Sequence, residues 1–324
     1  MSGGFNMTVR EYNGLSAIFF LPNLPTPLIA GVMAQRIGPG PVYIFFLAFA
    51  LLGNILVACA ALSPGAASLR WLLAGRLLMG ISYEAADMVP IGLLSPHFKH
   101  SWATVVGLIN GSNRLGSVCN FLLEPLVLQG FGLSGALLLP SALGACTFAI
   151  GVYIYRTEWR IRKVAAEAKP AGAQSSSSIG APATEAAPRA PPLSLRSLRA
   201  FSPCYWFYLA GCACVYGAVV PFWFIGAKHI AVKFKMSLAM SDAFLLWPEG
   251  AIAIIAPPFG LLIDRQRWRL RTRLNMAALS MLPVATAHTV LGLSSLPPLL
   301  AVGLLGVGNA CAQNLVWCTI TIVS

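Results

Sequence analysis

The sequence predicts an all-α membrane protein, and three observations lead to this fold class. The chain is 57% hydrophobic and only 10% charged, whereas soluble domains carry about 25% charged residues. Its mean hydropathy is +0.74. Apolar runs of about 20 residues, the length that crosses a bilayer as a helix, recur along the sequence. The net charge of +12 lies mainly between these runs, and no base-reading motif accompanies it, so it does not indicate nucleic acid.

Nine apolar segments predict nine transmembrane helices. They cover residues 12–34, 41–63, 70–94, 102–128, 131–155, 203–227, 238–262, 274–294 and 297–322. Proline and glycine inside them are tolerated, because neighbouring helices in a bundle satisfy the backbone groups that these residues free.

One connection differs from the others and divides the chain. Residues 156–200 are rich in Ser, Ala and Pro, are basic and lack an apolar period, which is typical of a flexible linker. We therefore expect a membrane half at 1–155, a linker at 156–200 and a second membrane half at 201–324. Most of the 22 Lys and Arg residues lie on the linker's side of the alternating spans, which predicts that this side is cytosolic.

Catalytic and metal-binding signatures are not found in the sequence. It contains no HExxH, GxSxG or GxxxxGK[ST] pattern, and its eight cysteines form no CxxC pair. The sequence therefore predicts neither an enzyme, nor a metal site, nor a cofactor.

A short motif occurs twice, at the cytosolic ends of the first and seventh spans. Gly31 to Arg36 reads GVMAQR, and Gly260 to Arg265 reads GLLIDR. Both resemble the G-x-x-x-D-R-x-G loop that follows the second and eighth helices of the twelve-helix major facilitator superfamily. The resemblance makes Arg36, Asp264 and Arg265 gating candidates, although Gln35 replaces the usual acid in the first copy.

The same resemblance assigns the nine spans to helices two to ten of the superfamily bundle, which has two pseudo-symmetric halves. We therefore expect the sequence to be a fragment of a twelve-helix carrier, produced by a truncated gene model, rather than a nine-helix protein.

Two ionisable residues are predicted near the middle of the membrane. Glu84 lies in the third span and Arg114 in the fourth, each about 18–21 Å from the end at which its helix enters. Buried ionisable residues are costly in a bilayer and commonly functional. The pair is predicted to bind substrate, with a structural ion pair as the alternative.

Other ionisable residues inside spans are weaker candidates. Asp87 lies one helical turn from Glu84, and Arg76 lies farther towards the non-cytosolic side. Glu249 is in the middle of the seventh span. We consider all three for coupling or gating, with structural roles as the alternative.

Longer segments carry a closer resemblance. GRLLMGISYEAADM and GSNRLGSVCN, together with PNLPTPLIAGVMAQRIG and PPFGLLIDR, resemble the lysosomal dipeptide transporter branch of the superfamily. The resemblance implies that Glu84 and Arg114 hold the two termini of a dipeptide. It also implies a lysosomal membrane location and a glycosylated single-span partner protein.

The predicted function is alternating-access transport of dipeptides or related zwitterions across the lysosomal membrane. A carboxylate suits the ammonium group of such a substrate, and an arginine offers a bidentate fork to its carboxylate. Two alternatives remain, a carrier of another small organic ion and a non-transporting scaffold or remnant. The expected partners are a small-molecule substrate and membrane lipid.

Overall fold

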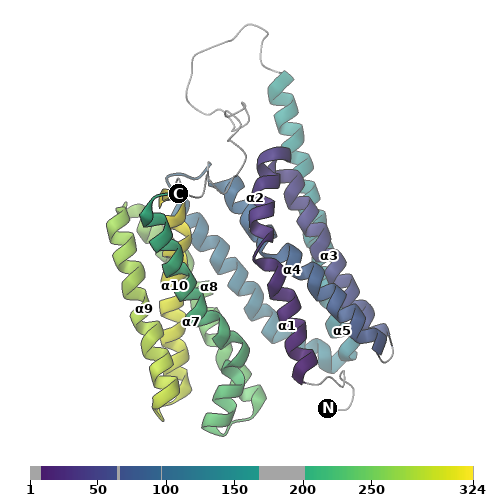
Figure 1. The fold of residues 1–324 in the computed structure, drawn as a ribbon, viewed down its shortest axis with the longest axis vertical. Coiled ribbons are helices and arrows are strands. Elements are labelled where there is room, and N and C mark those ends of the chain that lie inside the picture. The colour runs from purple at the N-terminus through teal and green to yellow at the C-terminus, as the bar shows by residue number, and fades with distance from the viewer. Residues whose placement is uncertain (1–8, 64–65, 96, 168–200, 324) are drawn as a thin grey trace. The chain divides into compact units, whose positions relative to one another are not determined.

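The computed structural model describes residues 9–63, 66–95, 97–167 and 201–323, and none of these forms a β-strand. The helices follow one another as long rods (Figure 1). They are α1 (Val9–Asn23), α2 (Thr26–Ile37), α3 (Pro39–Leu62), α4 (Ala66–Leu94), α5 (Trp102–Glu167), α7 (Pro203–Phe234), α8 (Leu238–Arg265), α9 (Leu270–Leu293) and α10 (Pro298–Val323).

The first predicted span is two helices, α1 and α2. The helix is interrupted by a turn at Leu24 and Pro25, which lie between Pro22 and Pro27, although Pro25 keeps φ −82° and ψ −27°. Proline has no backbone N–H, so three prolines in six residues remove donors from consecutive turns. The hydroxyl of Thr26 donates to the carbonyl of Pro22 across the break, with an oxygen–oxygen distance of 2.9 Å. The interruption is therefore local, and the two helices follow directly on one another.

The long helix α5 contains the fourth and fifth predicted spans. Gly132 has φ 66° and ψ −170°, and it separates two helical stretches. A positive φ is readily adopted by glycine, which has no Cβ. A continuous helix over the apolar part, Trp102–Thr157, would be about 84 Å long against a hydrocarbon core of about 30 Å. The interruption at Gly132 thus agrees with a chain that crosses twice.

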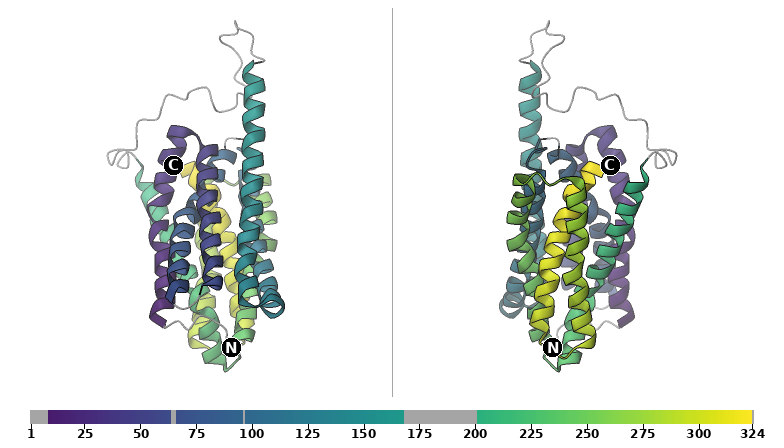
Figure 2. Two further views of the ribbon diagram at one scale, coloured as in Figure 1. Left: turned by 90° about the vertical axis from the view of Figure 1, so that its right-hand side faces the viewer. Right: turned by 90° about the vertical axis from the view of Figure 1, so that its left-hand side faces the viewer.

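The second stretch of α5 continues further than the sequence predicts. Residues 156–167, which we assigned to the linker, are helical, and 168–200 lie outside the described residues. The added turns are rich in Arg, Lys, Ala and Glu, which are strong helix formers. Figure 2 shows this teal helix continuing past the start of α3. The predicted division at 155 and 200 remains a prediction.

Seven of the described helical segments are long and apolar enough to cross a membrane. They include α1 with α2 as one segment, α3, most of α5, and α7 to α10. Helix α4, which carries Arg70, Arg76, Glu84 and Asp87, is not among them. A multi-pass membrane protein is therefore supported, whereas nine spans remain a prediction.

The helices form two compact units. One comprises Met1–His97 and Glu124–Leu193, and the other comprises Phe98–Leu123 and Ser194–Ser324. In the first unit, α3 packs along α4, and the hydroxyl of Ser141 on α5 donates to the Asn54 carbonyl of α3. Residues 102–123 of α5 belong to the second unit, so that unit contains part of the fourth predicted span.

The second unit is organised around α10. Helices α8 and α9 both pack along it, and α10 is the most enclosed of the seven apolar segments. A cluster of buried residues from α7, α8, α9 and α10 includes Phe222, Leu245, Val284 and Leu305. Polar side chains on α10 are therefore held away from lipid, and this enclosure is the setting of the site described next.

Candidate substrate site

An arginine and a glutamate form an ion pair inside the second unit. Nη1 of Arg114, on α5, lies 3.2 Å and 3.3 Å from the two carboxylate oxygens of Glu249, on α8. Nη2 of Arg114 donates to the side-chain oxygen of Gln313, on α10, over 3.4 Å. The guanidinium thus connects three helices of one unit, because Nη1 binds Glu249 and Nη2 binds Gln313.

The two charged side chains differ in how much of their surface is exposed. The side chain of Glu249 is 6% exposed and that of Arg114 is 27% exposed. Removing charges from water costs several kcal/mol per ion, and close pairing offsets part of this cost. Because Arg114 is the more accessible member, an incoming anion would meet the guanidinium first. Arg114 is therefore the member of the pair that a ligand could reach.

Small residues bring α5 and α8 close enough for this contact. Gly107 packs against the Ala256 carbonyl, and a Cβ at Gly107 would overlap that oxygen. A Cβ at Gly111 would lie 2.8 Å from the Pro257 ring. Small residues four apart permit such close approach of helices in membranes. The G-x-x-x-G pattern of the fourth span therefore packs helices, and one turn later it places Arg114 against α8.

A row of amide side chains on α10 lies beside the ion pair. Asn314 donates to the Ala256 carbonyl of α8 over 2.6 Å and accepts from Asn110 of α5 over 3.3 Å. Asn309 is fully buried, and neither its oxygen nor its nitrogen has a hydrogen-bond partner among the described residues. An unpaired buried amide is costly, so Asn309 is a polar group whose hydrogen-bonding needs the described residues do not meet.

The first unit contains the other predicted charges. Glu84 is half-buried on α4, and Asp87 is exposed one turn further along the same helix. The guanidinium carbon of Arg76 lies 6.0 Å from the centre of the Phe19 ring, which is a cation–π distance. Since Arg114 belongs to the other unit, the predicted opposition of Glu84 and Arg114 remains a prediction. Arg114 is nonetheless already paired, with Glu249.

The second copy of the repeated motif binds the beginning of a helix. The carboxylate of Asp264 accepts from the backbone N–H groups of Ala103 and Thr104, over 3.2 Å and 2.7 Å, and from the Thr104 hydroxyl over 2.7 Å. The first N–H groups of a helix have no intrahelical partner and favour an acid. Asp264 therefore caps α5 from a distant part of the chain, while Arg265 is exposed.

The first copy has different surroundings. Gln35 and Arg36 are both exposed at the end of α2, and a Cβ at Gly31 would meet no atom within 4 Å. The three gating candidates Arg36, Asp264 and Arg265 are thus placed at helix ends, and only Asp264 has a bonding partner that the structure shows.

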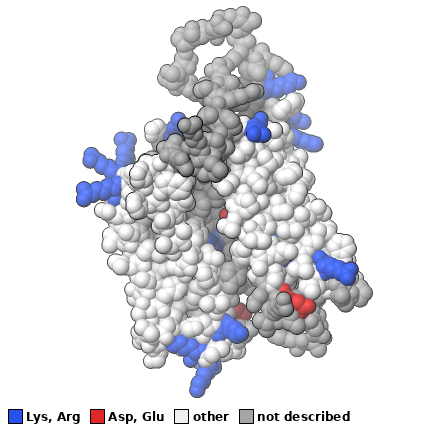
Figure 3. Space-filling model, in the orientation of Figure 1, with Lys and Arg blue, Asp and Glu red and all other residues white. Residues whose placement is uncertain are grey.

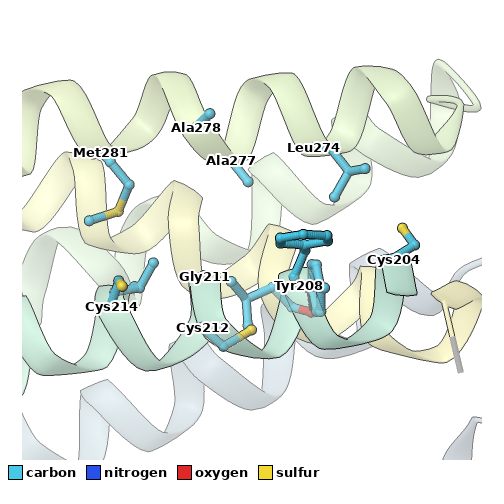
Figure 4. Close-up of a pocket in the computed structure, with 12 residues that line it drawn as sticks. Cys204, Tyr208, Gly211, Cys212, Cys214, Leu274, Ala277, Ala278 and Met281 are labelled. Carbon is cyan, nitrogen blue, oxygen red and sulfur yellow. Dashed lines mark hydrogen bonds between the residues drawn. The ribbon is translucent and has the colours of Figure 1, made fainter. Parts of the chain in front are cut away.

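A separate apolar cavity of about 610 Å³ lies between α7, α9 and α10. Figure 4 shows Tyr208 and Cys212 of α7 facing Leu274, Ala277 and Met281 of α9 across it. The Tyr208 hydroxyl donates to the Val316 carbonyl, so its polar atom is already satisfied. This cavity offers no charge to an ion and is distinct in chemistry from the site at Arg114.

Comparison with known families agrees with the motif and the helices. The chain matches the model of the Major Facilitator Superfamily across residues 1–323. The chain belongs to the Major Facilitator Superfamily. Members of this superfamily are membrane transporters, which agrees with the multi-pass helices of this chain. Among curated proteins, none matches the chain.

Membership at the level of the superfamily confirms the resemblance drawn from the two motif copies. It leaves the dipeptide branch as a proposal. Sequence reasoning missed Gln313, Asn309 and Asn314, although a signal was present. Three amides within six residues of an apolar span are unusual in a bilayer and indicate a lined cavity or a polar contact between helices.

Proposed function

We propose that this carrier moves dipeptides or closely related zwitterions by alternating access, with Arg114 as the ligand of the substrate carboxylate. The observation that supports this most is the Arg114–Glu249–Gln313 contact. A guanidinium in an apolar bundle, partly exposed and shared between a carboxylate and an amide, can exchange either partner for a substrate carboxylate. Planar carboxylates match its fork geometry.

The ammonium end of the substrate has two candidate carboxylates. The sequence resemblance favours Glu84, and the contact with Arg114 favours Glu249. When a substrate carboxylate binds Arg114, Glu249 loses its partner and would be stranded as a buried charge. Either a substrate ammonium or a proton then has to neutralise it. The choice between these two acids decides which helix holds the amino terminus.

A binding experiment with three ligands separates these roles. A dipeptide, its amino-acetylated form and its carboxamide are titrated against the purified chain by ligand-induced thermal shift. The dipeptide should bind best, because each blocked form lacks one charge. Arg114→Lys keeps the charge but loses the fork, so dipeptide affinity should fall at least about tenfold, since hydrogen bonds to charged groups contribute about 1.5–3 kcal/mol.

The same assay shows whether Glu84 or Glu249 binds the substrate ammonium group. Whichever of Glu84→Gln and Glu249→Gln reduces dipeptide affinity to that of the acetylated ligand identifies the ammonium ligand. Asp242→Asn is the matched control, because Asp242 is an exposed acid on α8. Equal binding of all three ligands, or an unchanged affinity of Arg114→Lys, would overturn the proposal. Binding of a simple organic anion in place of the dipeptide would favour a carrier of another small ion.

Stability measurements distinguish a purely structural pair. Breaking a buried ion pair costs about 3–5 kcal/mol, because one charge remains unpaired. Arg114→Gln should therefore lower the midpoint of thermal unfolding, and adding Glu249→Gln should restore it. A double variant that also regained wild-type dipeptide binding would show that the pair serves the fold alone.

The proposed location is the lysosomal membrane, with a glycosylated single-span protein as partner. Both rest on the segment resemblance, in particular on GRLLMGISYEAADM. Imaging of the tagged full-length protein beside a lysosomal marker tests the first, and co-purification of a glycosidase-sensitive membrane protein tests the second. A plasma-membrane distribution would contradict the location without affecting the binding site.

A further inference from the structure

The end of α8, the connection to α9 and the first turn of α9 are together strongly basic. They contain five arginines within nine residues, at positions 265, 267, 269, 271 and 273. Arg265, Arg267, Arg269 and Arg271 are exposed, and we call these four the arginine turn. Figure 3 shows Lys and Arg side chains gathered at the end of the molecule where α9 begins. The positive charge of these four side chains is therefore on the surface of the protein rather than buried in its interior.

The fifth arginine has a different role. Nε of Arg273 donates to the Trp268 carbonyl over 3.0 Å, and Nη1 donates to the Cys318 carbonyl of α10 over 3.3 Å. The turn also contains a left-handed residue, Arg267, with φ 48°. Arg273 thus ties the turn to α10, and the four exposed guanidinium groups extend from a braced backbone.

Within the described part of the chain, the structure shows no ion pair between an acid and the arginine turn. The only carboxylate in the connection is Asp264, whose oxygens accept from Ala103 and Thr104. The ion pair between Arg114 and Glu249 lies on other elements. Four positive charges within seven residues consequently repel one another, and a multivalent anion would relieve that repulsion.

The position of the turn brings it to the bilayer surface. The apolar segment of α8 ends at Arg265, and that of α9 begins at Leu270. Trp268 lies between them, its ring centre 5.9 Å from that of Phe259 on α8. Tryptophan is enriched at membrane interfaces, where its ring lies at headgroup level. The four arginines are therefore held at the depth of lipid phosphates.

A second basic run shows the contrast. Arg156, Arg160 and Lys163 are exposed on α5, beyond Tyr155, which contacts Gly40 at the start of α3. A helix advances 1.5 Å per residue, so Lys163 is about 12 Å further along. That distance exceeds the screening length of about 8 Å at physiological salt. The far end of the run on α5, at Lys163, thus lies beyond the screening length, whereas the whole arginine turn lies between the ends of two apolar segments.

We propose that the arginine turn binds the headgroup of a phosphorylated inositol lipid in the adjacent leaflet. Guanidinium groups bind phosphate oxygens in a bidentate manner, and several phosphates on one ring match four closely spaced cations. Each basic residue near an anionic surface contributes about 1 kcal/mol. The inference uses the cytosolic orientation predicted from the basic residues, and it does not depend on which substrate is carried.

Native mass spectrometry of the purified full chain tests the proposal. The chain is mixed with phosphatidylcholine, phosphatidylserine or phosphatidylinositol bisphosphate, and retained lipids are counted. The wild type should retain the bisphosphate most strongly. The variant R265Q/R267Q/R269Q/R271Q should lose about two to three powers of ten in apparent affinity, since four contributions of about 1 kcal/mol are removed.

The matched control removes four charges elsewhere. K99Q/R156Q/R160Q/K163Q has the same net charge, and its substituted residues are exposed too. It should keep bisphosphate binding within about twofold. If the quadruple turn variant does not fold, R269Q/R271Q is used, with a partial loss expected. Equal loss in the control, equal retention of phosphatidylserine and bisphosphate, or unchanged binding in the turn variants would overturn the proposal.

Discussion

The two copies of the glycine-to-arginine motif share a spacing but differ in what surrounds them. In the second copy, Gly260 packs so closely on Ala103 that a Cβ would overlap its carbonyl oxygen, and Asp264 accepts three hydrogen bonds from the start of α5. In the first copy, Gly31 faces open space and Gln35 is exposed. The same pattern therefore packs tightly against another helix in the second copy, whereas the structure shows no such contact for Gly31 in the first copy.

The difference follows from one side chain and one neighbour. A carboxylate attracts the partial positive charge at a helix N-terminus, whereas a neutral amide does so weakly. A glycine permits the helix to come within reach of that carboxylate. Both requirements are met at Gly260 and Asp264, so the motif there connects two helices of one compact unit. Three predictions test how far the copies differ.

The largest effect is expected at the glycines. Gly260→Ala inserts a methyl group into the Ala103 carbonyl, and overpacking of this kind costs about 1–3 kcal/mol. Gly31→Ala meets no neighbouring atom and gains up to about 1 kcal/mol in helix propensity. The unfolding midpoints of both variants in one detergent give the comparison. A similar shift of the unfolding midpoint in both variants would show that Gly260 is packed no more tightly than Gly31.

A smaller effect is expected at the acid. Asp264→Ala leaves the N–H groups of Ala103 and Thr104 without an acceptor, and losing a helix cap costs about 0.5–2 kcal/mol. Hydrogen exchange in the peptide containing these two residues should accelerate. Gln35→Ala serves as the control and should leave exchange unchanged throughout. Unchanged exchange in the Asp264 variant would mean that the cap does not stabilise α5.

The smallest effect is expected when the first copy is given the missing acid. Gln35→Asp places a carboxylate at an exposed position, where surface substitutions alter stability by less than about 0.5 kcal/mol. The unfolding midpoint should therefore stay where it is. A stabilisation as large as the loss in Asp264→Ala would reveal a helix end that receives this carboxylate, and the two copies would then be equivalent.

Much of the fold was predictable, because a bilayer imposes simple demands on a sequence. Helices satisfy their own backbone groups in lipid, and seven helical segments of the structure are long and apolar enough to cross, where the sequence predicts nine spans. Glycine and proline located the interruptions less well. Pro25 divides the first predicted span, and helix α5 continues to Glu167 into the predicted linker. Basic, alanine-rich residues read as a linker by composition, yet they favour a helix by propensity.

The site was predictable only in part. The charge of Arg114 within an apolar span marked it as a candidate from the sequence. Its contact with Glu249 joins residues separated by 135 positions, and no local pattern connects them. The amides Gln313 and Asn314 were also unremarkable one by one, and they gained meaning only as neighbours of α5 and α8.

By itself, the sequence determined the membrane class, most spans and the superfamily, since hydropathy and a short repeated motif are properties of consecutive residues. Tertiary structure decided the partners. Gly107 and Gly111 let α5 approach α8, and that approach brings Arg114 to Glu249 and Asp264 to Thr104. Charges in a medium of low dielectric must find partners wherever packing places them. Packing between distant helices, rather than any one segment, therefore decided which charges meet.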